Sequence, residues 1–199
     1  LNYHPAVSSD GSMIAFISDR TGQNNLWVMN ADGSNPRVVH RDDNARMMTP
    51  AWTPDGEYII VKRQPAGPGA NRGGGGLWML HRDGGQGVQI LDDNSAHWPS
   101  VSSDGRYVYY HVRTGSDALA GDYQIRRLEL KNGEVTAVTA GRSQGAAAGR
   151  GSSGGAFAPE ISPDGRWLAF ARQLPDATVS FKGRRFGPRT ALWLRDLET

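Results

Sequence analysis

The residues that come nearest to a known catalytic pattern lie in one serine- and glycine-rich stretch, residues 141–155. Two segments in it, GRSQG (141–145) and GSSGG (151–155), match the G-x-S-x-G pattern of a serine nucleophile, and GRGSSG (149–154) matches the G-x-G-x-x-G pattern of a dinucleotide-binding turn. Both patterns work between a strand and a helix, where the serine is exposed or the helix N-terminus faces phosphate. The sequence after each match is too rich in glycine to sustain a helix. We therefore predict neither a catalytic residue nor a cofactor site here.

Metal-binding patterns are weaker still. The five histidines are His4, His40, His81, His97 and His111. None of them stands in an H-E-x-x-H motif or at the short spacing of a zinc site, and the chain contains no cysteine. An EF-hand loop centred on Gly33 would need carboxylates where Val28 and Val39 stand. The sequence therefore predicts no metal site in this chain.

One phrase recurs four times and organises the whole chain. Its copies are PAVSSDG (5–11), PAWTPDG (50–56), PSVSSDG (99–105) and PEISPDG (159–165). The shared aspartates, Asp10, Asp55, Asp104 and Asp164, are 45, 49 and 60 residues apart. A repeat of this length with several short strands in each copy is typical of a β-propeller blade.

Each copy is a predicted four-stranded antiparallel meander. In the first copy the expected strands are 6–8, 13–17, 26–29 and 37–39, with Asp-Gly turns between β-type runs. No helical period persists over ten residues, so we expect essentially no helix. The predicted fold is all-β: a propeller with about four blades, at 1–44, 45–94, 95–142 and 156–199, and flexible glycine-rich insertions at 65–76 and 141–155.

The fourth copy has expected strands at 160–162, 167–171 and 191–196, and no fourth strand. Closed propellers usually have four to eight complete blades. We therefore expect residues 1–199 to form a partial propeller, an incomplete ring from the interior of a longer protein.

Large side chains recur at matching places in the expected second strands: Phe16, Val61, Tyr110 and Phe170. We predict that they fill the space between neighbouring blades, because each blade must bury both of its faces. Two acidic pairs, Asp42-Asp43 and Asp92-Asp93, stand at equivalent ends of the first two blades. We interpret these pairs as solvent-exposed connectors rather than as an acid/base pair.

One constellation is a candidate binding site. The residues just before each repeated proline are expected at the mouth of the central channel: Tyr3, His4, Met48, Thr49, His97, Trp98 and Phe157. Polar and aromatic groups that converge on a funnel are suited to binding a peptide, a protein or a small ligand. The alternative is that these residues only cap the ring and pack against one another.

Composition limits the classes of partner. The chain has 22 basic and 20 acidic residues, a net charge of +2, and 38% apolar residues. This near balance gives no reason to expect a nucleic-acid partner. No apolar run approaches the length of a membrane span, and the absence of cysteine leaves the compartment open.

Three linked motifs in the first copy resemble the WD-like repeat of TolB-type propellers. They are S-x-D-G, I-A-F-x-S-D-R-x-G and L-W-V-M-N-x-D-G-S. This repeat is found in the periplasmic TolB protein, in tricorn-type proteases and in relatives of prolyl oligopeptidase. The likeness extends over all four copies and implies a TolB-like propeller. It implies little about function, because many proteins reuse the scaffold.

The segment 181–197 resembles a narrower group, the large secreted bacterial proteins that join such a propeller to a metal-dependent amidohydrolase barrel. In that group the metal ligands belong to the barrel, and none of the barrel motifs occurs here. The resemblance implies a scaffold, a substrate-gating module or an interaction module in an exported hydrolase, with other blades or a catalytic domain of the same chain as partners. A periplasmic or secreted location is implied in the same way.

Two alternatives stay open. In the first, the chain belongs to a TolB-like periplasmic propeller that binds proteins and has no enzyme activity. In the second, it belongs to another peptidase with a propeller, which a downstream G-x-S-x-G motif in an α/β-hydrolase context would reveal.

Overall fold

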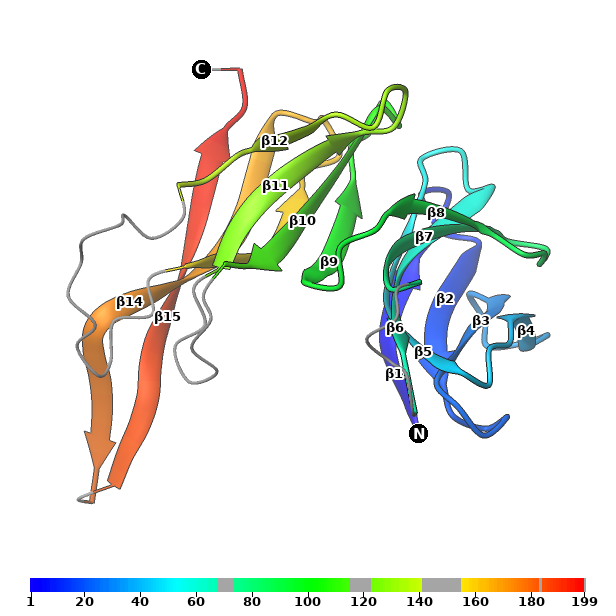
Figure 1. The fold of residues 1–199 in the computed structure, drawn as a ribbon, viewed down its shortest axis with the longest axis horizontal. Coiled ribbons are helices and arrows are strands. Elements are labelled where there is room, and N and C mark those ends of the chain that lie inside the picture. Colours follow the sequence, from blue (N-terminus) through cyan, green and yellow to red (C-terminus); the bar gives the residue numbers. More distant parts are fainter. Residues whose placement is uncertain (68–73, 115–122, 141–154, 183, 199) are drawn as a thin grey trace.

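The computed structural model describes residues 1–67, 74–114, 123–140, 155–182 and 184–198. All regular secondary structure in these ranges is β-strand. The fifteen strands form four antiparallel sheets (Figure 1). The strands of each sheet follow in chain order, so each sheet is a meander. The first strands of successive sheets contact one another around a common axis. This arrangement confirms the predicted all-β propeller with four blades.

Sheet 1 contains β1 (Asn2–Val7), β2 (Met13–Ser18), β3 (Asn25–Asn30) and β4 (Arg37–His40). Sheet 2 contains β5 (Ala45–Trp52), β6 (Tyr58–Pro65), β7 (Gly76–His81) and β8 (Val88–Leu91). Sheet 3 contains β9 (Ala96–Val101), β10 (Tyr107–Arg113), β11 (Tyr123–Glu129) and β12 (Val135–Ala137). Sheet 4 contains β13 (Ala156–Ile161), β14 (Trp167–Phe181) and β15 (Arg184–Asp196). Within the described residues, sheet 4 therefore has three strands where the others have four.

The repeated prolines lie on the inner strands β1, β5, β9 and β13. Each of these strands pairs on one side only, with the second strand of its own sheet. A proline has no N–H to offer a second neighbour, so a strand with one free edge accommodates it. The four inner strands contact one another in the order β1, β5, β9, β13 and thereby line the axis.

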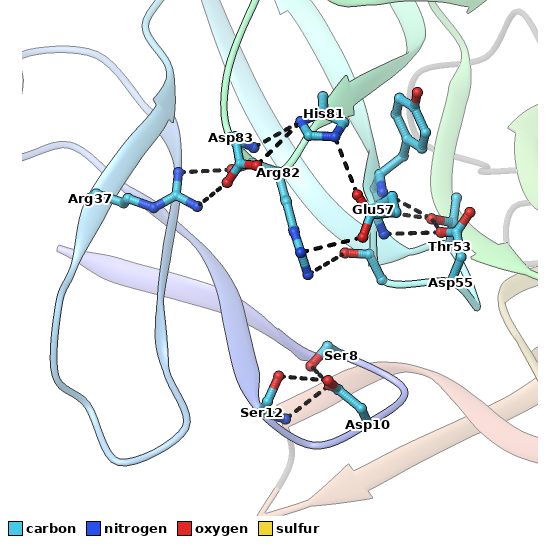
Figure 2. Close-up of polar contacts among 12 residues, drawn as sticks. Ser8, Asp10, Ser12, Arg37, Thr53, Asp55, Glu57, His81, Arg82 and Asp83 are labelled. Atoms are coloured by element: carbon cyan, nitrogen blue, oxygen red, sulfur yellow. Dashed lines mark hydrogen bonds and ion pairs between the residues drawn. The ribbon is translucent and has the colours of Figure 1, made fainter.

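Each inner strand leads into the Asp-Gly turn, which is built in the same way in every blade. Asp10 accepts hydrogen bonds from the Ser8 hydroxyl at 2.6 Å and from the Ser12 backbone N–H at 3.0 Å (Figure 2). These two bonds, the Ser8 bond first, lower the pKa of Asp10 to about 2. Equivalent bonds are accepted by Asp55, Asp104 and Asp164.

The glycine of the turn is required for its backbone conformation. Gly56 has a φ of +70°, and a Cβ added there would meet nothing within 4 Å. The cost of another residue is therefore backbone strain alone, and asparagine tolerates this conformation better than a β-branched residue does. We expect Gly56→Val to lower the free energy of unfolding by about 2 kcal/mol and Gly56→Asn by less than half of that. Urea denaturation of the full-length protein measures both, and equal midpoints for the parent and Gly56→Val would refute the turn.

The hydrophobic core lies between the sheets rather than inside any one of them. Val61 belongs to the cluster between sheets 1 and 2, Tyr110 to the cluster between sheets 2 and 3, and Phe170 to the cluster between sheets 3 and 4. All three side chains are buried. This is the packing that the sequence predicts, and it holds for Val61, Tyr110 and Phe170. Phe16 of β2 is buried as well, but it belongs to none of these clusters and stacks on Trp27 of its own sheet at 6.4 Å.

A polar network also links sheets 1 and 2 near their outer edges (Figure 2). Arg37 of β4 donates hydrogen bonds to the Arg82 carbonyl at 2.8 Å and to Asp83 at 3.0 Å. Arg82 and His81 both approach Glu57, with nitrogen–oxygen distances of 3.3 and 3.4 Å. These side chains are substantially exposed, so each pair contributes little energy. The network orients the neighbouring strands.

The acidic pair Asp42-Asp43 is predicted to be solvent-exposed, and the structure shows this for only one of the two residues. Asp43 is exposed and pairs with Arg41 at 3.1 Å. Asp42 is only 13% exposed and forms an ion pair of 2.6 Å with Arg63 of β6. The connector prediction is therefore wrong for Asp42, because a cationic partner 21 residues away buries it against sheet 2.

The outward face of sheet 4 is uncovered in the described part of the chain. Leu192 pairs with Ala171 at the position that Leu26 and Leu77 hold in sheets 1 and 2. Leu26 and Leu77 are 0% exposed because the next sheet covers them, whereas Leu192 is 77% exposed. This face is therefore built like the covered ones, as expected for an incomplete ring.

The strands β14 and β15 form one long hairpin. The two strands continue well past the predicted 167–171 and 191–196, and the hairpin projects beyond the blade (Figure 1). Much of the two glycine-rich insertions, at 68–73 and 141–154, lies outside the described residues together with the motif matches of the second. Within the described ranges, no helix has the length and apolar character that crossing a membrane requires.

Candidate functional site

A cavity of about 870 Å³ runs along the inner strands of all four sheets and the turns that follow them. Sheets 1, 2, 3 and 4 contribute, respectively, His4, Thr49, Trp98 and Glu160. A cavity of this size lies in the range typical of ligand sites. We refer to it as the axial pocket.

The residue before each repeated proline has a left-handed backbone. The φ angles are 53° at His4, 48° at Thr49, 57° at Trp98 and 49° at Ala158. In every sheet, this residue lies where the pairing of the inner strand shifts by one residue, which is a β-bulge. A bulge re-aims side chains, and a left-handed non-glycine residue costs about 1–2 kcal/mol. Three of the four strained residues, His4, Thr49 and Trp98, line one cavity, and repeated backbone strain of this kind is an outlier that can mark a functional position.

Three of the seven residues predicted at the channel mouth line the axial pocket: His4, Thr49 and Trp98. The other four are not part of its lining: Tyr3, Met48, His97 and Phe157. Trp98 is 44% exposed, so its ring is accessible from the cavity side.

Aromatic contacts join most of these residues. The His4 ring lies 4.9 Å from Tyr3 and 5.5 Å from Trp98, both edge to face. Trp98 stacks on His111 at 6.4 Å, and His111 in turn contacts His97 at 5.9 Å and Phe157 at 6.3 Å. His111 connects the cluster, and it is missing from the predicted set.

Backbone hydrogen bonds to two histidines fix the left-handed residues. The Thr49 N–H donates to His4 Nδ1 at 3.4 Å, and the Ala158 N–H donates to His111 Nδ1 at 3.1 Å. Both imidazoles accept through Nδ1, so the proton of the neutral ring is on Nε2. Sequence reasoning could not find His111, because its only signal was a polar residue in a buried second strand.

The buried histidines are neutral at physiological pH. Burial, with Lys62 as a second cause, lowers the pKa of His97 to about 4. Burial and the neighbouring His97 lower the pKa of His111 to about 4. Lys62 is 0% exposed and donates to the Asn94 carbonyl at 2.6 Å, and burial lowers its pKa to about 8.

These shifts predict acid sensitivity. The folded pKa of His111 lies below its unfolded value of about 6.5, so the unfolded chain takes up the proton first as the pH falls. Stability is therefore complete above about pH 6.5 and is lost toward pH 4, by about 3 kcal/mol at most for His111. We expect His111→Gln, which keeps an acceptor but does not titrate, to reduce the fall in melting temperature between pH 7 and pH 4.5. His40→Gln on the outer strand should leave that fall as it is, and an unchanged fall in His111→Gln would contradict the assignment.

Two hydroxyl groups of the pocket form hydrogen bonds with backbone groups. The Ser9 hydroxyl donates to the Pro54 carbonyl at 2.6 Å, and Ser100 Oγ accepts the Ile161 N–H at 3.1 Å. Both hydroxyls are thus engaged with backbone rather than with a histidine base. Within the described residues, no three side chains of His, Asp or Glu are grouped so as to hold a metal ion.

Comparison with known proteins places the fold. No known family model matches the chain. The uncharacterized peptidase YuxL of Bacillus subtilis (strain 168) is 27% identical over 180 residues, which are 89% of this chain and 23% of YuxL. The chain thus spans about a quarter of that relative's length.

Solved structures give the architecture. The putative TolB of Agrobacterium tumefaciens superposes with a TM-score of 0.67 at 18% identity, covering 98% of this chain and 61% of that protein. TolB of Acinetobacter baumannii gives 0.69 at 16% identity, covering 100% and 42%. Puromycin hydrolase gives 0.61 at 14% identity, covering 98% and 28%. The chain therefore has the fold of the TolB-type β-propellers.

Proposed function

We propose that this chain is the accessory propeller of a longer, exported hydrolase and that it contacts a peptide substrate through the axial pocket. The observation that carries the proposal is the repeated left-handed residue, which brings His4, Thr49 and Trp98 to the pocket from three successive sheets. The described residues that line the axial pocket supply side chains suited to binding. The reaction itself would take place in a catalytic domain of the same chain.

The comparisons support the hydrolase part of the proposal. YuxL is called a peptidase, puromycin hydrolase is named for a hydrolysis, and this chain covers only 23% and 28% of them. A propeller that accounts for a fraction of a hydrolase is suited to admitting or positioning substrate. These relatives favour a peptidase as the parent, while the amidohydrolase parent stays a prediction from the 181–197 segment.

A second candidate is a TolB-like periplasmic propeller that binds a protein and has no enzyme activity. The superpositions on two TolB structures favour it. In this case the axial pocket would hold a segment of a partner protein instead of a substrate. Both candidates place the protein outside the cytoplasm, so the proposed location is the periplasm or the exterior.

The role of the pocket is tested by Trp98→Ala in the full-length protein. We expect kcat/KM for a substrate of ten or more residues to fall about tenfold, as when an exposed aromatic anchor is removed. A short chromogenic substrate that does not reach the propeller should change by less than twofold. Trp167→Ala is the matched control, because Trp167 is comparably exposed (37%) but lies outside the pocket. Equal losses for both substrates in a folded variant would count against a peptide contact here.

A further inference from the structure

The axial pocket has an uneven charge. Among the described residues that line it, Glu160 carries a negative charge and none is a lysine or an arginine. Within the described residues, the Glu160 carboxylate forms no ion pair and accepts no hydrogen bond. Partial desolvation raises the pKa of Glu160, the direction expected of a carboxyl group without a cationic neighbour. A positively charged group on a ligand would form the ion pair that this carboxylate lacks.

Glu160 and Trp98 face the pocket from adjacent strands. The Ile161 N–H donates to Ser100 Oγ at 3.1 Å, which holds β13 against β9 next to both residues. Trp98 offers a partly exposed indole ring. An aromatic face beside a carboxylate suits a long cationic side chain, since the ring covers its apolar stem and attracts its charged end.

Thr49 is a second, independent indication of a ligand. It is 7% exposed and lines the pocket, and its Oγ1 atom has no hydrogen-bond partner in the described part of the chain. A buried hydroxyl without a partner costs free energy that a ligand amide would recover. Thr49 and Glu160 are thus two lining residues whose side chains have unsatisfied polar atoms in the described part of the chain.

The shape of the pocket indicates an extended peptide rather than a compact ligand. The lining follows β1 from His4 through the turn residue Ser9, a length of at most about 17 Å at about 3.3 Å per residue. The free edges of the inner strands face this space. Pro5, Pro50 and Pro99 each remove one N–H group from these strands, so the strands carry fewer donors than carbonyl acceptors and favour ligands that supply donors.

We propose that the axial pocket binds an extended peptide through one lysine or arginine side chain, with Glu160 as its counter-charge and Trp98 against its stem. The inference rests on the proposed peptide-binding function and names the kind of peptide. Residues flanking the cation would be apolar or proline, in keeping with the proline residues of the pocket wall.

The test uses the full-length protein and two hexapeptides with acetylated and amidated ends, Ac-Ala-Pro-Lys-Ala-Pro-Ala-NH2 and its norleucine analogue. Calorimetric titration gives the two dissociation constants, and mass spectrometry after each titration checks that the peptide is intact. We expect the lysine peptide to bind the parent at least tenfold more tightly. Glu160→Gln should reduce that ratio to below twofold without changing the affinity for the norleucine peptide.

Glu134→Gln is the matched control, because Glu134 is exposed and lies away from the pocket. Equal affinities of the parent for the two peptides, or a preference for lysine that survives in Glu160→Gln, would overturn the inference. If both peptides bind equally and Trp98→Ala abolishes both, the peptide site stands and only the cation is wrong. If neither peptide binds at millimolar concentration, the proposed peptide contact itself fails.

Discussion

Asp42→Ala is expected to lower the free energy of unfolding by about 3–5 kcal/mol, the loss typical of removing one member of a buried ion pair. The Asp42 carboxylate accepts two hydrogen bonds from the Arg63 guanidinium, at 2.8 and 2.6 Å, and one from the Asn44 N–H at 2.9 Å. The side chains of Asp42 and Arg63 are only 13% and 17% exposed. Without the carboxylate, Arg63 would keep its charge in a poorly solvated place.

The direction of the Asp42 pKa agrees with this account. Burial alone would raise the pKa of Asp42, but the Asn44 N–H and the Arg63 guanidinium outweigh it and hold the pKa below its usual value. The carboxylate is therefore ionised, and its contribution is present at neutral pH and lost as the pH falls through the folded pKa.

The adjacent aspartate provides the control for this prediction. Asp43 is 63% exposed and its partner Arg41 is 58% exposed, so Asp43→Ala should cost no more than about 0.5 kcal/mol. Urea denaturation of the full-length protein, followed by tryptophan fluorescence, measures both variants. Comparable losses for Asp42→Ala and Asp43→Ala would mean that the Asp42–Arg63 pair does not join the first two blades.

Gly76→Ala is expected to be comparably damaging, at about 3 kcal/mol or more from steric overlap and backbone strain together. Gly76 begins β7 with a φ of +105°. A Cβ there would lie well inside van der Waals distance of the Leu91 carbonyl oxygen and 2.8 Å from the Asp93 backbone nitrogen. Both obstacles are backbone atoms, which cannot turn aside as a flexible side chain would.

Gly33→Ala separates the two causes. Gly33 has a φ of +86°, and its added Cβ would meet nothing within 4 Å, so only the backbone term of about 1 kcal/mol applies. Hydrogen exchange of the β7 and β8 amides in the full-length protein should rise strongly in Gly76→Ala. If Gly33→Ala and Gly76→Ala raised exchange in their own blades equally, the close approach of Gly76 to Leu91 would be wrong.

The fold could be predicted from the sequence because its signals are local and repeated. The Asp-Gly turn recurs four times, and the structure gives its aspartates and glycines the same role in every blade. The large residues that recur in the second strands predict the packing between blades in the same way. A pattern that would be weak evidence in a single copy predicts the fold because it recurs in all four copies.

The sequence indicated some of the residues that line the axial pocket and missed others. The rule that residues before each proline lie at the channel found His4, Thr49 and Trp98, yet not which neighbours turn away from the pocket. That choice depends on the one-residue bulge, which reverses the usual alternation of side chains along a strand. Glu160 stands two residues after Ala158, and nothing in its local sequence distinguishes it from the other exposed carboxylates.

Long-range partners explain the remaining differences. Asp42 and Asp43 are identical neighbours in the sequence, and only Arg63, on a strand of the next blade, makes one of them buried. The strands β14 and β15 extend past their expected ends because they pair with each other over the whole hairpin. Neither contact leaves a periodic signal in the residues themselves.

Whether this propeller belongs to a longer hydrolase is decided by the intact mass of the full-length protein from its native source, with zinc determined on the same sample. We expect a chain several times the length of these 199 residues, as in YuxL, where the matching part is 23% of the protein. A zinc-free protein of that size would favour the peptidase parent, and one or two zinc ions per chain would favour the amidohydrolase parent. A metal-free product no larger than one propeller ring and a small extra domain would contradict the central claim and make this a TolB-like binding protein.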